Sequence, residues 1–438
     1  IAARSTVIEK QERYKCYEVL SVMKKKEKCK IRYILLGAMF AALLLLIVFM
    51  RFGGFSTGEA ANVDELQEYA LPVETLSIPE EKKIIALGEA THGNVEFQRL
   101  KLEVFKKLLE ERGVRAFALE GDCGGCEAVD RYIHGGEGTA QEAAAAIGFA
   151  IYRTEEMAEL VSYLREYNEN ASAGEDVRFY GFDMQRISRT FQFLMEGCAE
   201  SNIDTTELEK LTEGENLNPA YDLSAQAGIL SRVKNELESS GASDKTLHYA
   251  DMLLQYCELQ SVPTADGGAL RDGFMAENVK WIFQQEQQRG HERIFVTGHN
   301  SHVAKWGSYD SMGKILSEDA ENGYYAIGTD FYRTRCNLPA RSSGKRTEQV
   351  FYSHDPLAKA AKLAGYDRCW LDFAKIPEHS ELGSEIAEYT TLGNLGENYS
   401  LLMRLLPPSY RMFQPPAVLY DSMIFVSDAT PTKMISEA

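Results

Sequence analysis

The sequence predicts an α/β protein: a mostly parallel central sheet flanked by helices, with a helical insertion, preceded by one N-terminal transmembrane helix. Three observations carry this prediction. Short apolar runs rich in β-branched and aromatic residues alternate with amphipathic helical patterns, as in parallel α/β sheets. Residues 185–290 contain helical patterns but few strand-like runs. An uncharged apolar run, "YILLGAMFAALLLLIVFM", covers residues 33–50.

The predicted strands are apolar runs short enough to be buried in a sheet. They are residues 83–88, 114–120, 176–183, 293–300, 324–331, 368–373 and 422–428. Helical patterns lie between many of them, and "EFQRLKLEVFKKLLEER" (residues 96–112) places its apolar side chains along one helical face. We interpret residues 185–290 as a helical insertion that covers the binding crevice, although plain structural packing would give the same pattern.

The N-terminal region has the charge pattern of a membrane anchor. Residues 1–32 hold ten Lys/Arg and four Asp/Glu, and the apolar run that follows is about long enough to cross a bilayer. The positive-inside rule then predicts a cytoplasmic tail (1–32), an anchor (33–51), a linker (52–62) and an extracellular domain (63–438) at the cell membrane. A cleavable signal peptide is the alternative, but its basic region is usually much shorter.

Composition limits the possible partners. The 438 residues carry a net charge of −18, which argues against nucleic acid as a general partner. Cys123 and Cys126 form "CGGC", and its two glycines favour a loop over the helix start typical of a thioredoxin-like site. We therefore expect incidental thiols or a local disulfide there.

Acids and histidines follow the predicted strands, at the edge where open α/β sheets bind ligands. Glu89 and His92 come after the first strand, and Glu120 ends the second. Asp183 ends the third, while His299 and His302 follow the fourth. Because the carboxyl ends of parallel strands meet at one edge, we expect these side chains to converge. Helix capping would equally explain Asp183 and also Asp330, which ends the fifth strand.

Two kinds of chemistry suit such a cluster. In metal-free hydrolysis, an imidazole takes a proton from water and a carboxylate orients the imidazole. In a metal site, the same imidazoles and carboxylates would be ligands. The sequence contains no HExxH motif, no GxSxG nucleophile elbow, no GxGxxG and no P-loop.

Several motifs together resemble the erythromycin esterase family. They are "LGEATHG" with "EFQRLK", "FALEGD", "VRFYGFDMQ", "GHNSHVAK", "YYAIGTDF" and "YDSMIFVSDATP", and they span roughly residues 82–430. The pair GEATHG and GHNSHV is specific, whereas either motif alone is weak. The resemblance implies an α/β fold with a helical insertion and a deep cleft. It also implies hydrolysis of an ester, in the type case a macrolide lactone, without a metal or other cofactor.

The resemblance also implies roles for individual residues. His92 looks like the general base, Glu89 like its acidic companion, and Glu120 like the glutamate that closes the second strand. His299 and His302 look like the histidine pair, one of which would bind or polarise the ester carbonyl.

Candidate substrate-binding residues are Lys101, Glu96 and Asp183, although Glu96 could simply stabilise the first turn of its helix. Family members that hydrolyse macrolides carry arginine at the position of Lys101, and lysine lacks the bidentate fork of arginine. Macrolide hydrolysis is therefore less expected than ester hydrolysis in general.

The leading functional hypothesis is a membrane-anchored, extracytoplasmic carboxylic ester hydrolase that acts on a small ester or macrolide-like substrate. One alternative is a metal-dependent hydrolase with Glu89, His92, His299 and His302 as ligands. Another is a non-catalytic surface protein that binds a ligand in the same cleft.

Overall fold

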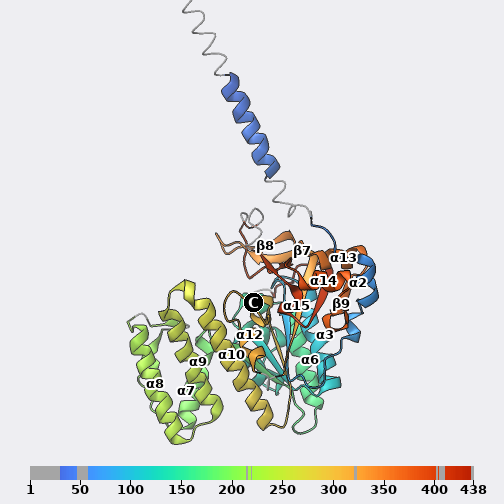
Figure 1. The fold of residues 1–438 in the computed structure, drawn as a ribbon. Coiled ribbons are helices and arrows are strands. Elements are labelled where there is room, and N and C mark those ends of the chain that lie inside the picture. Colours follow the sequence, from blue (N-terminus) through green and yellow to red (C-terminus); the bar gives the residue numbers. More distant parts are fainter. Residues whose placement is uncertain are drawn as a thin grey trace, which may run out of the picture. The chain divides into compact units, whose positions relative to one another are not determined.

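The computed structural model describes residues 30–46, 58–213, 216–218, 220–319, 323–400, 403 and 410–435. The chain divides into two compact units, Ile1–Gly54 and Phe55–Ala438. In the first unit, residues 30–46 form a helix. The second unit contains the sheet and its helices, coloured from blue (α2, Val63–Tyr69) to red in Figure 1.

The main sheet has eight strands within the described residues. All seven predicted strands are confirmed, and one further strand extends the sheet. The strands are β1 (Ile84–Glu89), β2 (Ala116–Asp122), β3 (Arg178–Asp183), β6 (Ile294–His299), β7 (Tyr324–Pro339), β8 (Arg346–Tyr352), β9 (Arg368–Asp372) and β12 (Ser422–Ala429). Two small antiparallel pairs are β4 (Thr212–Glu213) with β5 (Asn216–Leu217), and β10 (Thr390–Gly393) with β11 (Arg411–Gln414).

The strand order creates a switch point in the middle of the sheet. The order is β3-β2-β6-β1-β7-β12-β9, with β8 paired to the second half of β7. The strands from β3 to β12 pair in parallel, and β9 runs antiparallel to β12. The chain leaves β1 toward β2 on one side and leaves β6 toward β7 on the other. In open α/β sheets, ligands bind at the carboxyl ends beside such a point.

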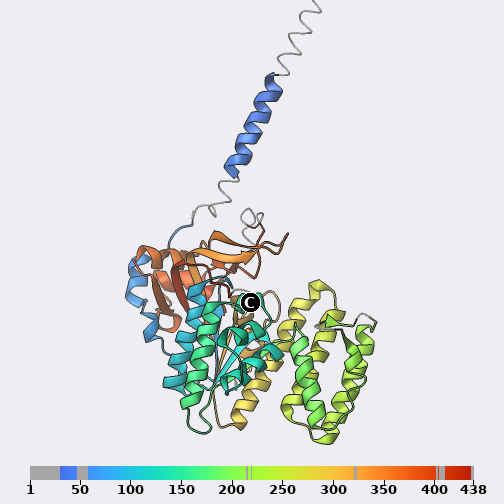
Figure 2. The same ribbon diagram turned by 180° about the vertical axis from the view of Figure 1, so that it is seen from behind.

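Helices cover both faces of this sheet (Figures 1 and 2). The helices described in this unit are α2 (Val63–Tyr69), α3 (Val95–Arg112), α4 (Cys123–Ile133), α5 (Ala140–Ala146), α6 (Glu155–Asn170), α7 (Ser188–Glu200), α8 (Leu223–Ser240), α9 (Asp244–Ser261), α10 (Thr264–Gln288), α11 (Asn300–Val303), α12 (Met312–Glu318), α13 (Pro356–Leu363), α14 (Glu381–Ala387) and α15 (Pro416–Leu419). Short 3-10 turns cover Val73–Thr75, Ala150–Tyr152, Glu209–Leu211 and Phe373–Lys375.

Alternating side chains of the central strands pack into two separate hydrophobic layers. In β1, Ile84 and Ala86 join the layer that contains α10 and α12, whereas Ile85 and Leu87 join the layer that contains α3 and α6. Both layers are made of buried apolar side chains, so a strand between them has a continuous apolar sequence. This burial explains why the strands could be recognised in the sequence.

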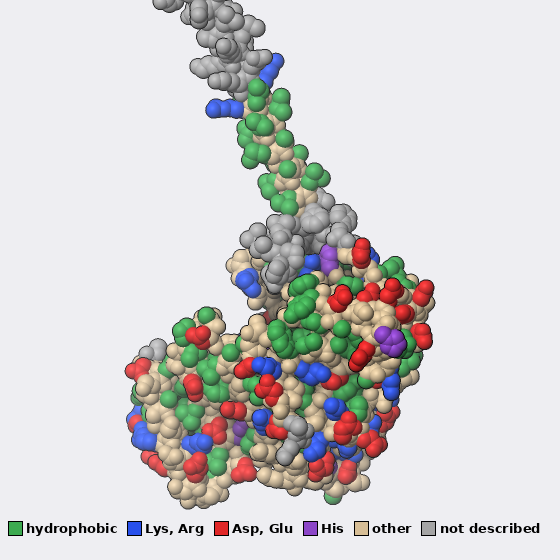
Figure 3. Space-filling model, viewed as in Figure 1, with side chains coloured by type: hydrophobic (Ala, Val, Ile, Leu, Met, Phe, Trp, Pro, Cys, Tyr) green, Lys and Arg blue, Asp and Glu red, His purple; other side chains and the backbone are tan. Residues whose placement is uncertain are grey.

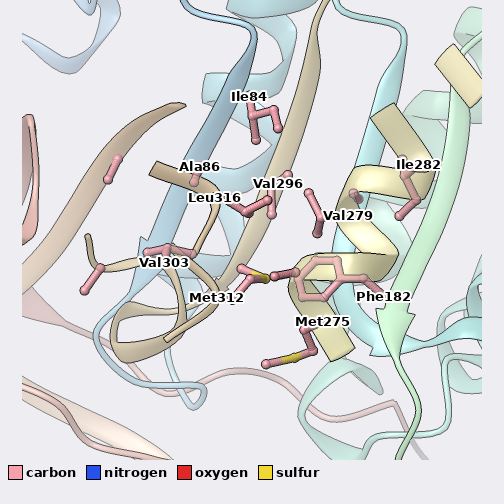
Figure 4. Packing of buried hydrophobic residues seen from close by; sticks show 14 of the residues in the cluster. Ile84, Ala86, Phe182, Met275, Val279, Ile282, Val296, Val303, Met312 and Leu316 are labelled. Atoms are coloured by element: carbon pink, nitrogen blue, oxygen red, sulfur yellow. The ribbon is translucent and has the colours of Figure 1, made fainter. Parts of the chain in front are cut away.

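The predicted helical insertion is made of two parts. Helices α7, α8 and α9 pack on one another, and both ribbon views show them grouped beside the sheet domain. Helix α10 instead packs on the sheet: Met275, Val279 and Ile282 lie against Phe182 of β3 and Val296 of β6 (Figure 4). This packing fixes the start of α10 near the carboxyl ends of the strands.

The prediction of a transmembrane helix at residues 33–51 is wrong. Among the described residues, no helix is long and apolar enough to cross a membrane. Hydrophobic side chains cover the visible face of the helix over residues 30–46 in Figure 3, with basic side chains toward one end.

The predicted location in the cell membrane, with an extracellular C-terminal domain and the membrane as a partner, depended on that helix and is wrong with it. Residues 1–29 of the predicted tail, 47–51 of the predicted anchor and 52–57 of the predicted linker lie outside the described residues. The last linker residues belong to the folded unit, since Ala61 is buried and the Asn62 side chain caps α2.

The CGGC segment is the first turn of α4, so the expected loop is wrong. Both thiols are free and buried, and burial raises the pKa of each well above its ordinary value. A side chain at Gly124 would place its Cβ 2.1 Å from the backbone nitrogen of Thr190 in α7. The glycines therefore allow close helix packing.

We expect Gly124→Ala to destabilise the fold by about 1–3 kcal/mol, because the added methyl meets backbone that cannot move cheaply. Gly228→Ala is the matched control, since a Cβ there meets nothing within 4 Å in the exposed part of α8. That control should stabilise the protein by up to about 1 kcal/mol. Urea unfolding measures both changes, and equal effects would contradict the packing argument.

Candidate active site

The carboxyl ends of β1, β2, β3 and β6 bring most of the predicted residues together. Glu89 and His299 are register partners at the ends of β1 and β6. The carboxylate of Glu120 at the end of β2 accepts the backbone N–H of His299 over 2.7 Å. Parallel pairing thus places acids and imidazoles from three strands side by side, as the sequence predicted.

Glu89 is held in place by two side chains of α3. Lys101 Nζ lies 2.6 Å from Glu89 Oε2, and Gln98 donates to Glu89 Oε1 over 3.0 Å. Both charged side chains are only 1% exposed. Burial would raise the pKa of Glu89, but the charge of Lys101 and then that of His92 outweigh burial and lower it. The carboxylate is therefore ionised although it is buried.

His92 faces both Glu89 and His299. Its Nδ1 lies 3.6 Å from Glu89 Oε2, and its ring centroid lies 5.0 Å from that of His299. His299 Nδ1 lies 2.9 Å from the hydroxyl of Ser301, while His299 Nε2 is buried without a hydrogen-bond partner. Two imidazoles, each backed by a neighbouring side chain, thus face each other.

Arg271 of α10 bridges the acids of two neighbouring strands. It donates to Glu120 Oε1 over 2.8 Å and to Asp183 Oδ2 over 2.6 Å. Burial would raise the pKa of Glu120, but His302 and Arg271 outweigh burial and lower it strongly. Asp183 is fully buried, so its structural task is to hold Arg271.

His302 lies between two acids and Arg271. Its Nδ1 is 2.8 Å from Asp272 Oδ1, and its Nε2 is 3.4 Å from Glu120 Oε1 and 3.2 Å from Arg271 Nη1. Burial would lower the pKa of His302, but Glu120 and Asp272 outweigh burial and raise it. Burial and the two neighbouring imidazoles instead lower the pKa of His299 to about 3.

Two predicted substrate-binding residues have other partners in the structure. The ammonium of Lys101 is directed at Glu89 and Gln98, so it positions the acid. Both carboxylate oxygens of Glu96 accept hydrogen bonds from Thr430, which ties α3 to the segment after β12. Asp330 also lies outside the cluster and accepts the backbone N–H groups of Phe331 and Gly393.

Sequence reasoning missed Arg271, Asp272 and Gln98. Arg271 and Asp272 lie in the helical insertion, and Arg271 is 151 residues from Glu120 in the chain. The only local signal was a charged pair just before the apolar face of α10. Gln98 stands three residues before Lys101 on the same helical face, so the spacing could have identified it.

No group of three or more His, Cys, Asp or Glu side chains in the described ranges has a geometry that could hold a metal ion. The acids of the cluster are instead neutralised by Lys101 and Arg271. This charge pairing distinguishes the cluster from a set of ligands that converge on one point.

The sequence profile of the erythromycin esterase family matches residues 109–429. The chain belongs to the erythromycin esterase family. It is 26% identical over 349 residues to erythromycin esterase type II of Escherichia coli, covering 68% of this chain and 82% of that protein. It is also 24% identical over 396 residues to the putative hydrolase YbfO of Bacillus subtilis (strain 168), covering 75% and 86%. Membership of the erythromycin esterase family points to a hydrolase.

Solved structures share the fold of this erythromycin esterase family member. A Bacillus cereus protein superposes with a TM-score of 0.69 at 20% identity, covering 85% of this chain and 98% of that one. A succinoglycan biosynthesis protein gives 0.70 at 19% identity with the same coverage. A mutant of the erythromycin esterase EreC in an open conformation gives 0.57 at 14% identity, covering 82% and 93%.

We expect Lys101→Met to destabilise the protein by about 3–5 kcal/mol, because it leaves the buried Glu89 carboxylate without its counter-charge. Lys107→Met is the control on the same helix, since the Lys107–Glu111 pair is partly exposed and should contribute less than about 1 kcal/mol. The contribution of Lys101 to the free energy of unfolding should be complete at pH values above the ordinary pKa of a carboxyl group. It should fade as the pH falls through the lowered pKa of Glu89. Denaturant unfolding at several pH values measures this, and equal losses in both variants would contradict it.

We expect His299 and His302 to titrate far apart. His299 should stay neutral until the pH approaches about 3, whereas His302 should hold its proton above the ordinary histidine range. Nitrogen-detected NMR of the imidazoles measures both, with His302→Gln used to assign the signals. Equal titration of the two rings near the ordinary value would contradict the geometry.

Proposed function

We propose that this chain hydrolyses a carboxylic ester by activating water with His92. The observation that carries the proposal is the opposed pair of imidazoles, His92 and His299, with ring centroids 5.0 Å apart at the ends of β1 and β6. Each ring has a polar neighbour, since His92 Nδ1 lies 3.6 Å from Glu89 and His299 Nδ1 lies 2.9 Å from Ser301. Such a pair can activate a nucleophile from one side and polarise an electrophile from the other.

In this proposal, His92 is the general base. A proton on Nδ1 directed at Glu89 leaves Nε2 free to take a proton from water, and the ionised Glu89 then stabilises the imidazolium. Lys101 and Gln98 act through Glu89, so they are positioning residues. The hydroxide equivalent attacks the ester carbonyl carbon, and the carbon–oxygen bond to the alcohol breaks in a second step.

His299 suits the carbonyl oxygen. If its Nδ1 accepts from Ser301, its Nε2–H is a buried donor with no protein partner in the described chain. The low pKa keeps this imidazole neutral, so it donates a hydrogen bond without a net charge to desolvate. His302, with its raised pKa, suits the group that gives a proton to the departing alkoxide.

The family relationship supports hydrolysis, and the relative from Escherichia coli is an erythromycin esterase by name. The family match begins after Glu89 and His92, so their roles rest on the geometry above. Glu120 supports the site by holding the backbone of His299 and the guanidinium of Arg271.

We expect His92→Ala and Glu120→Gln to lower ester hydrolysis by at least about a hundredfold. The first change removes the general base, and the second removes the charge that holds the His299 backbone and the Arg271 guanidinium. Incubation with macrolides and simple esters, followed by mass spectrometry for the gain of one water, measures the activity. Arg99→Gln is the control, since that side chain is 57% exposed on α3. Full activity in both site variants, with folding shown by circular dichroism, would end the proposal.

A further inference from the structure

A second feature lies at the same edge of the sheet, beyond the ends of β2 and β3. A cavity of about 550 Å³ opens there, a size that fits a small molecule or the charged end of a larger one. Its walls come from Asp122, the end of α5, the β3–α7 connection and Tyr256 of α9. Most of its lining is polar, unlike the apolar clefts that usually bind uncharged ligands.

Basic side chains dominate the charge of this cavity. Arg186 and Arg189 line it, and neither guanidinium forms a salt bridge within the described part of the chain. Arg153 contributes a third guanidinium to the wall. The carboxylate of Glu142 also lines the cavity, but it is engaged in the capping box of α5 with Thr139. The guanidiniums of Arg186 and Arg189, which form no salt bridge in the described residues, favour oxyanions in such a concave site, because a guanidinium can bind an oxyanion in a bidentate manner.

Two further features, the N-terminus of a helix and a buried carboxyl group, add to this preference for anions. Helix α7 begins after Ile187, which offers no side-chain cap, so the positive end of a helix of 13 residues borders the cavity. Asp122 is 2% exposed, and its Oδ1 has no hydrogen-bond partner in the described chain. Burial raises the pKa of Asp122 to about 8, so near neutral pH it is a potential O–H donor rather than a competing anion.

The cavity adjoins the candidate catalytic cluster through shared elements. Asp122 pairs in register with Asp183, whose carboxylate holds Arg271. Tyr152, the residue before Arg153, donates its hydroxyl to the backbone carbonyl of Glu120. A ligand in the cavity would therefore lie beside the strand ends that carry the hydrolytic residues.

We propose that this cavity is an anion-binding subsite and that the ester substrate carries a carboxylate or phosphate group that binds there. This inference rests on the proposed hydrolysis for its link to substrate, whereas anion binding itself does not. A cationic ligand would meet the guanidiniums unfavourably, so the subsite selects acidic esters over esters that carry an amine.

Calorimetric titration of the full chain with phenyl phosphate, benzoate and benzyl alcohol tests the subsite. We expect at least one anion to bind and the neutral alcohol not to bind. Arg186→Gln with Arg189→Gln should weaken that binding about tenfold or more, since charge-assisted hydrogen bonds are lost. Arg232→Gln, on the exposed side of α8, is the control and should bind as the wild type does. Absence of anion binding, or equal binding by the double variant, would overturn the inference.

The anionic group that binds more tightly is then built into an aryl ester and compared with the same ester lacking the charge. We expect the double variant to raise KM for the charged ester about tenfold and to leave the neutral ester unchanged. His92→Ala separates the two proposals, because it should abolish ester hydrolysis and leave anion binding unchanged. Retained anion binding with no hydrolysis of any ester, even by the wild type, supports the subsite and removes the proposed activity. Hydrolysis by the wild type without any anion binding supports the proposed activity and overturns the subsite.

Discussion

Arg271 holds the candidate site together, because its guanidinium is the counter-charge for two buried carboxylates on neighbouring strands. Without it, two buried carboxylates on neighbouring strands would lack their shared counter-charge, which is costly for a buried charge. Glu120 in turn fixes the backbone of His299. The orientation of an imidazole on β6 thus depends on a residue that arrives on α10.

A second counter-charge, Lys101, does the same for Glu89. The two cations divide the site into a half that holds His92 and a half that holds His302. Each half keeps a carboxylate ionised beside an imidazole, yet the environments push the pKa of His299 down and that of His302 up. Separation of this kind lets one cluster supply a neutral donor and a proton donor at the same pH.

Burial explains which parts of the fold were predictable. Strands buried on both faces, such as β1 and β6, are continuous apolar runs, and each ends in a polar residue where the sheet ends. The N-terminal apolar run also contains no charged residue, yet no helix in the described ranges is long and apolar enough to cross a membrane. Gly124 and Gly125 suggested a loop because their use, close packing of α4 against α7 and α5, involves residues remote in sequence.

The sequence by itself determined the parallel sheet and the polar residues at its carboxyl edge, because apolar periodicity and strand ends are local properties. Tertiary structure decided which of those residues work together. Lys101 and Glu96 looked alike as charged side chains of one helix, yet one neutralises Glu89 and the other bonds Thr430. The position of Arg271 and the shape of the cavity beside Asp122 depend on where α10 and α7 pack. Such contacts join segments that are far apart in the sequence, so no fixed residue spacing indicates them.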